Sequence, residues 1–143
     1  MNMYSFATPQ KILELGDISI GGQPGERPTV LFGTVFYGRR YRVLTQEVKE
    51  KVQHFIAQQE EMAEMTGNPA LVDIFIDTKE HIAERIELVL ECLPDGRYFS
   101  VDVPEAEVRM SVLQYLSDQG LLCRTIYNSL NLGITDSEAK CLK

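Results

Sequence analysis

The chain has 143 residues, enough for one domain with a hydrophobic core and too few for two ordinary domains. Its 44% apolar and 24% charged residues are typical of globular proteins, and its net charge of −7 disfavours binding to nucleic acid or anionic lipid. No apolar run reaches the roughly 20 residues that cross a bilayer, and the first ten residues lack an apolar signal-peptide core. We therefore expect a cytoplasmic protein without direct membrane insertion.

The cysteines and histidines form no disulfide or metal-binding pattern. Cys92, Cys123 and Cys141 are widely spaced and odd in number, which favours buried or incidental thiols. The two histidines, His54 and His81, both fall within helical patterns. We therefore expect no metal in this chain.

The predicted elements begin with a hairpin over residues 11–20. Apolar and polar residues alternate on either side of Gly16-Asp17, which predicts two short strands joined by a tight turn. Glycine and proline exclude helix and strand over residues 21–28, and this stretch has neither a P-loop ending nor GxGxxG spacing. Residues 29–37 form a near-continuous apolar run, typical of a buried parallel strand.

Two helices and a second strand follow. A helical period runs from residue 46 to 65 and ends at Gly67-Asn68-Pro69. Residues 70–76 predict the second strand, and Thr78 is expected to cap the next helix. The apolar stripes expected on the two helices are Val48, Val52, Phe55, Ile56, Met62 and Ala63, and then Ile82, Ile86, Val89, Leu90 and Leu93.

The last part of the chain repeats this alternation. Residues 98–103 predict a third strand, followed by a helix over 104–119. Residues 121–126 predict a fourth strand, and Thr135 or Asp136 opens a fourth helix. Strand spacings of roughly 25 to 40 residues fit right-handed βαβ crossovers in a parallel sheet.

These patterns together predict an α/β fold. We expect residues 1–143 to form a single domain, with a hairpin at 11–20 and four βα units over 29–143. Four units are half of the eight that close a (β/α)8 barrel.

Polar side chains at the carboxyl ends of the predicted strands are candidates for a site, because ligands of parallel α/β sheets bind there. Asp73 lies within the second strand and either bonds a neighbouring loop or is functional. Asp102 closes the third strand and could instead cap the helix after it. Asn128 and Ser129 follow the fourth strand, where Asn128 could simply shape a turn. Asp77 is most simply interpreted as a helix cap.

A basic cluster follows the first strand of this predicted sheet. Arg39, Arg40 and Arg42 surround Tyr41. The cluster could hold a phosphate or an acidic partner, although a solvated loop is the favoured interpretation. Pattern by itself therefore gives an α/β domain with a few well-placed polar residues.

The sequence also resembles a known family. Residues 20–31, which include GGQPGE, and residues 33–37 resemble the opening of the H subunit of tetrahydromethanopterin S-methyltransferase. The resemblance continues through 59–62 and 66–69 and ends at 126–131, so it covers essentially the whole chain colinearly. This family is similar to corrinoid-dependent pterin methyltransferases and to dihydropteroate synthases in having a pterin-binding barrel.

The resemblance implies a methyltransferase subunit of one-carbon metabolism and methanogenesis. Its expected activity is transfer of the N5 methyl group of a methyl-tetrahydropterin (tetrahydromethanopterin or tetrahydrofolate) to the cobalt of a corrinoid on a partner protein. The implied pterin contacts are Asp102 and Asn128, with Asp73 and Ser129 beside them. A carboxylate and a carboxamide can pair in plane with the edge of a pterin. The family commonly has Asp-Ser at the third strand, where this chain has Asp102-Val103.

The resemblance places this chain in the N-terminal half of the barrel. The polar group expected near N5, which would help a tertiary amine to leave, comes from the second half, so no catalytic residue is assigned. Alternatives are a non-catalytic half-barrel module for pterin binding or assembly, and a truncated, inactive open reading frame. The protein is expected to contact a corrinoid-carrying partner, at the periphery of a membrane complex.

A half-barrel would also expose two sheet edges and an inner face. Unpaired strand edges and an uncovered apolar face are templates for association. We therefore expect a homo-oligomer, or a second chain that supplies the other half-barrel. The residues expected on the exposed apolar inner face are Phe32, Phe36, Ile74, Ile76, Val101 and Val103.

Overall fold

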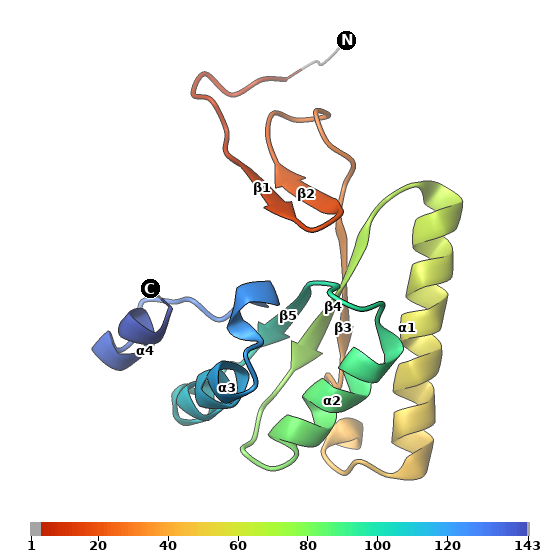
Figure 1. The fold of residues 1–143 in the computed structure, drawn as a ribbon, viewed down its shortest axis with the longest axis vertical. Helices are drawn as coiled ribbons and strands as arrows, with labels where there is room; N and C mark the ends of the chain where they lie inside the picture. Colours follow the sequence, from red (N-terminus) through yellow and green to blue (C-terminus); the bar gives the residue numbers. More distant parts are fainter. Residues whose placement is uncertain (1–3, 143) are drawn as a thin grey trace.

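The fold combines a small antiparallel hairpin with a parallel sheet that is covered by helices (Figure 1). The computed structural model describes residues 4–142. The strands are β1 (Ile12–Leu15), β2 (Ile18–Gly21), β3 (Leu31–Val35), β4 (Ala70–Phe75), β5 (Phe99–Asp102) and β6 (Thr125–Tyr127). The α-helices are α1 (Gln46–Thr66), α2 (Ile82–Cys92), α3 (Ala106–Asp118) and α4 (Asp136–Cys141), and short 3-10 turns cover Arg39–Tyr41 and Leu122–Arg124.

The four strands of the parallel sheet are arranged in chain order, β3-β4-β5-β6. One hydrophobic core joins the sheet to α1, α2 and α3, which therefore cover the same face. This core takes Ile74 and Val101 from the central strands, Val52 from α1, Ile86 from α2 and Val112 from α3. The predicted α/β fold with a parallel sheet is confirmed.

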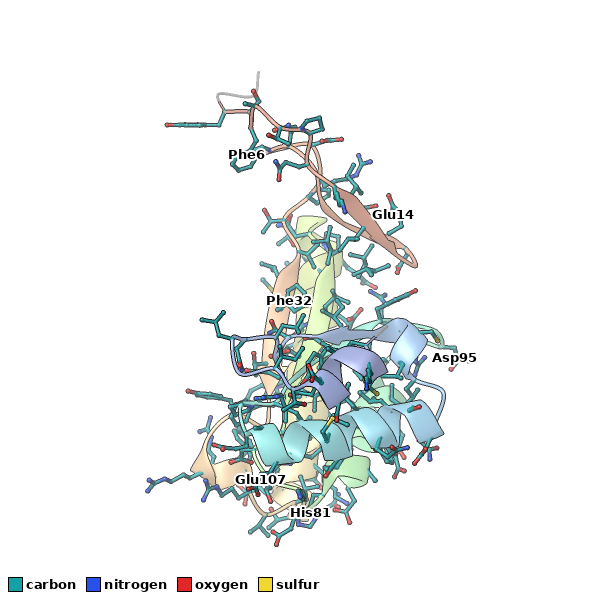
Figure 2. All side chains as sticks on the ribbon, turned by 90° about the vertical axis from the view of Figure 1, so that its left-hand side faces the viewer. Phe6, Glu14, Phe32, His81, Asp95 and Glu107 are labelled. Atoms are coloured by element: carbon teal, nitrogen blue, oxygen red, sulfur yellow. The ribbon has the colours of Figure 1, made fainter. Side chains whose placement is uncertain are left out.

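The predicted hairpin is also confirmed and lies at the amino ends of the parallel strands (Figure 1). Gly16 forms its turn with a φ of 68°, a conformation that favours glycine. The carboxylate of Asp17 lies 3.7 Å from the guanidinium of Arg97, just before β5. In Figure 2, Glu14 of the hairpin lies above the parallel sheet, and His81, which precedes α2, lies at the bottom of the molecule. The end where α2 and α3 begin is the carboxyl end of the sheet.

The fourth strand is shorter than its apolar run predicts. After Gly120, which has a φ of 66°, the N–H of Leu121 donates back to the carbonyl of Leu116 over 2.8 Å. The N–H of Arg124 then donates to Leu121, so the chain keeps turning. The prediction of strand from residue 121 is wrong, because these local bonds end α3 and form the 3-10 turn Leu122–Arg124, so the strand begins only at Thr125.

Helix α1 buries a narrower stripe than its sequence predicts. Val52 and Ile56 are buried, but Phe55 and Met62 remain exposed. The prediction for these last two is wrong because α1 covers the edge strand β3. Within residues 4–142, the main contacts of α1 are with α2, β3 and β4. No helix in that range is long and apolar enough to cross a bilayer.

Helix α2 begins without the cap that the sequence predicts at Thr78. The helix starts at Ile82, and its N-cap residue is His81, which makes no side-chain capping bond. The hydroxyl of Thr78 instead accepts a hydrogen bond from the N–H of Glu80 over 3.3 Å. The prediction for Thr78 is wrong, because an extra turn separates β4 from the helix.

Candidate functional site

The face of the sheet opposite the helices is where polar side chains gather. Side chains alternate between the two faces of a strand. Because Ile74 and Val101 pack under the helices, Asp73, Ser100 and Asp102 lie on the opposite face, which we call the open face.

The expected apolar inner face is therefore wrong. The five residues of that set that are buried in the helix-covered core are Phe36, Ile74, Ile76, Val101 and Val103. Only Phe32 of the set is exposed. Asp73 and Ile74 are adjacent in β4, so their side chains point to opposite faces of the sheet. Because Asp73 lies on the open face, Ile74 lies on the helix-covered face. The open face is consequently more polar at the carboxyl end than the sequence predicts.

A row of polar side chains crosses the three strands β3, β4 and β5. Thr34 is in register with Asp73, which is in register with Ser100. The hydroxyl of Thr34 donates to Oδ2 of Asp73 over 3.0 Å. Asp73 is 3% exposed, and neither its Oδ1 nor the hydroxyl of Ser100 has a hydrogen-bond partner within residues 4–142. Buried polar atoms are rarely left unpaired, so this row has unused hydrogen-bonding capacity: the Asp73 oxygen can accept, and the Ser100 hydroxyl can donate or accept.

Asp102 lies on the same face at the end of β5, in register with Phe75. Burial raises the pKa of Asp102, and the nearby negative charge of Asp73 raises it further. The alternative that Asp102 caps a helix is wrong, because the N-cap of α3 is Glu105. A buried carboxylate, Asp73, and a partly buried one, Asp102, therefore lie near each other on adjacent strands.

Asn128 and Ser129 follow β6 beside this pair. The backbone N–H of Asn128 donates to the carbonyl of Val101 over 3.0 Å, which extends the β5–β6 ladder. The Asn128 side chain is exposed and makes no hydrogen bond to residues 4–142. Ser129 is buried, and its hydroxyl accepts a 2.7 Å bond from the N–H of Val103. The fold thus fixes the backbone of Asn128 and the side chain of Ser129, and within residues 4–142 it leaves the Asn128 carboxamide without a hydrogen-bond partner.

Asp77 and the basic cluster join a different network at the same end of the sheet. Asp77 accepts hydrogen bonds from Arg42, at 3.3 Å, and from Arg85, at 3.4 Å. Arg85 is fully buried and also donates to the carbonyls of Phe75 and Tyr41. The interpretation of Asp77 as a helix cap is wrong, because its carboxylate is paired with arginines. This network ties the loop after β3 to the end of β4.

Sequence reasoning missed Thr34, Ser100 and Arg85. Thr34 stands inside a run whose pattern indicates a continuously apolar strand, and Ser100 is one small residue in another. Once the register is known, Thr34 is seen to lie opposite Asp73 on the neighbouring strand. Ser100 lies two residues before Asp102 and therefore faces the same way. Arg85 interrupts the apolar stripe of α2 and gives no signal of burial in the sequence.

Similarity to known proteins extends over almost the whole chain. Residues 8–143 match the family described as "Tetrahydromethanopterin S-methyltransferase MtrH subunit". The chain is 39% identical over 145 aligned positions to the H subunit of tetrahydromethanopterin S-methyltransferase from Methanothermobacter marburgensis, covering 99% of this chain and 46% of that protein. It is 34% identical over 139 positions to the protein of the same name in Methanopyrus kandleri, covering 94% and 42%.

A differently named relative gives a similar match. The chain is 38% identical over 145 positions to the H subunit of the "Putative methyltransferase mtx" of Methanosarcina acetivorans, covering 98% of this chain and 46% of that protein. The chain thus spans about half the length of the curated relatives that it matches. It belongs to the MtrH family, the H subunits of tetrahydromethanopterin S-methyltransferase.

Proposed function

We propose that the chain is part of a methyltransferase subunit that binds a methyl-tetrahydropterin on the open face of its sheet. The N5 methyl group of the pterin would pass to the cobalt of a corrinoid on a partner protein. The names of the relatives support a methyltransferase and a tetrahydromethanopterin substrate. The observation that carries the proposal is the pair of carboxylates at the carboxyl end, Asp73 and Asp102, next to the free carboxamide of Asn128.

The donors and acceptors on the open face fit the edge of a pterin. A pterin presents N–H groups beside ring nitrogen and carbonyl acceptors. Ionised carboxylates only accept hydrogen bonds, whereas a carboxamide both donates and accepts. Asp102 and the unpaired Oδ1 of Asp73 would accept from the N–H groups, and Asn128 would pair with a ring acceptor. Ser129 would keep Asn128 in place, because its hydroxyl already bonds the backbone after β5.

The methyl transfer itself needs a carrier that this chain does not supply. The corrinoid would provide a nucleophilic cobalt centre on a partner protein. The residues of this chain would orient the pterin and leave N5 facing the carboxyl end of the sheet. No residue of this chain is proposed as the proton donor to N5.

We further propose that residues 1–143 are one domain that forms half of a (β/α)8 barrel. The four strands follow one another in chain order, and the helices that connect them cover a single face. A closed barrel has this arrangement in every half, with its open face inside. The hairpin would then lie across the amino-terminal mouth of the barrel, away from the site.

Binding of a tetrahydropterin tests the proposed function. We expect Asp102→Ala to weaken binding of methyl-tetrahydromethanopterin roughly tenfold to a hundredfold, the loss of about 1.5–3 kcal/mol for a charge-assisted hydrogen bond. Asn128→Ala should weaken it roughly twofold to tenfold, the loss of about 0.5–1.5 kcal/mol for a neutral hydrogen bond. Asp95→Ala is the matched control, because Asp95 lies in the exposed turn before β5 (Figure 2). Unchanged affinity in both site variants would contradict the proposal.

A further inference from the structure

An aromatic pair lies beside the two carboxylates on the open face. Phe75 is the register neighbour of Asp102, so its ring stands next to that carboxylate on the adjacent strand. The ring of Tyr37 contacts Phe75 edge to face, with centroids 5.0 Å apart and planes at 73°. Tyr37 is 68% exposed, and Phe75 is partly exposed. We call this pair the aromatic ledge.

The backbone is distorted in a way that creates this ledge. Phe36 has a φ of 64°, which is unfavourable for a bulky residue with a Cβ atom. Strict alternation from Val35 would send Phe36 to the open face and Tyr37 to the helix-covered face. Instead both Val35 and Phe36 are buried in the helix-covered core, and Tyr37 reaches Phe75. The left-handed turn at Phe36 thus places a second aromatic ring on the open face.

Surrounding contacts hold the distorted residue in place. The guanidinium of the buried Arg85 lies 5.4 Å from the centre of the Phe36 ring. Arg85 also bonds the carbonyls of Phe75 and Tyr41, on the strand and the loop that flank the ledge. A strained backbone conformation persists only where surrounding contacts hold it in place, and residues of this kind cluster at ligand-binding sites.

We propose that the aromatic ledge is the surface on which the ring system of the substrate stacks. This inference rests on the proposed function and names the residues that would contact the planar pyrimidine ring of a tetrahydropterin. A pterin whose edge pairs with Asp102 presents its faces to the side chains on neighbouring strands. Phe75 flanks that position, and Tyr37 extends the apolar surface toward the carboxyl end. Stacking on aromatic rings is sensitive to removal of the ring and insensitive to removal of the tyrosine hydroxyl.

Calorimetric titration of the full chain with 6-methyltetrahydropterin under anaerobic conditions tests the ledge. We expect Phe75→Leu and Tyr37→Leu to weaken binding about threefold to tenfold, the range for loss of an aromatic contact. Tyr37→Phe keeps the ring and should bind within about twofold of the unmodified chain. Phe55→Leu is the control, since Phe55 is an exposed phenylalanine on α1, away from the open face.

A spectroscopic measurement separates stacking from a structural role. Stacked pterin should show a shifted ultraviolet difference spectrum, which Phe75→Leu and Tyr37→Leu should each reduce at saturating pterin and Phe55→Leu should retain. Because Tyr37 is mostly exposed, its variants remain informative even if Phe75→Leu unfolds.

The two proposals fail in different ways. If the unmodified chain binds and Asp102→Ala binds at least tenfold more weakly, while both ledge variants bind normally, the ledge is overturned and the proposed function stands. If the ledge variants change only thermal stability or self-association, the rings serve protein packing and the inference is wrong. If the unmodified chain does not bind the pterin, the proposed function is wrong, and the inference that the pterin stacks on the aromatic ledge is wrong as well.

Discussion

The guanidinium of Arg109 donates two hydrogen bonds to the carboxylate of Glu138, at 2.6 and 3.3 Å, and both side chains are buried. Glu138 also accepts a bond from the hydroxyl of Tyr127, at 2.9 Å. Arg109 donates further to the carbonyls of Pro104 and Gly133. This one pair therefore connects α3 and α4 to the loops that follow Asp102 and Asn128.

The first prediction is that breaking this pair destabilises the fold. Arg109→Met or Glu138→Gln should lower the free energy of unfolding by about 3–5 kcal/mol, because each leaves a buried partner without its counterion. Urea unfolding followed by circular dichroism measures the change. Glu47→Gln is the control, since Glu47 pairs with Lys51 on the exposed surface of α1 and should have little effect. Equal effects of the buried and exposed changes would refute the assignment.

The second prediction concerns acid unfolding. The hydrogen bond from Arg109 is the main reason that the pKa of Glu138 is lowered to about 2 from its ordinary 4.5. Since the folded-state pKa is the lower one, ionised Glu138 contributes stability above pH 4.5 that is lost as the pH falls toward 2. Unfolding measured at several pH values should show this loss. In Glu138→Gln the slope over that window should be smaller, and an unchanged slope would rule out Glu138 as its source.

The third prediction concerns the pH dependence of ligand binding. Burial and the charge of Asp73 raise the pKa of Asp102, and only the ionised carboxylate accepts hydrogen bonds on both oxygens. Binding of a tetrahydropterin should therefore weaken at a higher pH than an ordinary aspartate would require. Asp73→Asn removes the neighbouring charge, so the acid limb of the binding curve should move to lower pH. Protonation of the ligand is the same in both measurements, so it cancels in the comparison. If the acid limb of the binding curve lies at the same pH in the unmodified chain and in Asp73→Asn, the two aspartates are not coupled.

The fourth prediction concerns association. β3 and β6 are the edges of the sheet within residues 4–142, and Leu31 and Phe32 on β3 are 46% and 44% exposed. An exposed apolar edge strand is a template for pairing with another chain. We expect self-association at micromolar concentration in sedimentation velocity, and Phe32→Lys should shift the distribution toward the monomer. A stable monomer of the unmodified chain at that concentration would be incompatible with this expectation.

The sequence by itself determined the order of elements and the positions of the candidate residues. Period and punctuation predicted the hairpin, the parallel strands and most helix ends, because glycine at 67 and the Thr135 cap act through local backbone geometry. The same local patterns predicted that Asp73 and Asp102 lie in strands. Their possible role came from the family resemblance.

Only the tertiary structure decided which face each of these residues uses and what surrounds it. The sequence predicts the wrong face for the buried apolar residues, because both faces of β4 contain apolar positions. The alternation of side chains along a strand does not show which face the helices cover, and this is known only once the helices are placed. Contacts between segments far apart in sequence also pair Arg85 with the carbonyl of Tyr41 and Arg109 with Glu138. The periodicity of the sequence does not predict such contacts. The turn at Phe36 is of the same kind: core packing and Arg85 hold a strained backbone that no local preference of phenylalanine predicts.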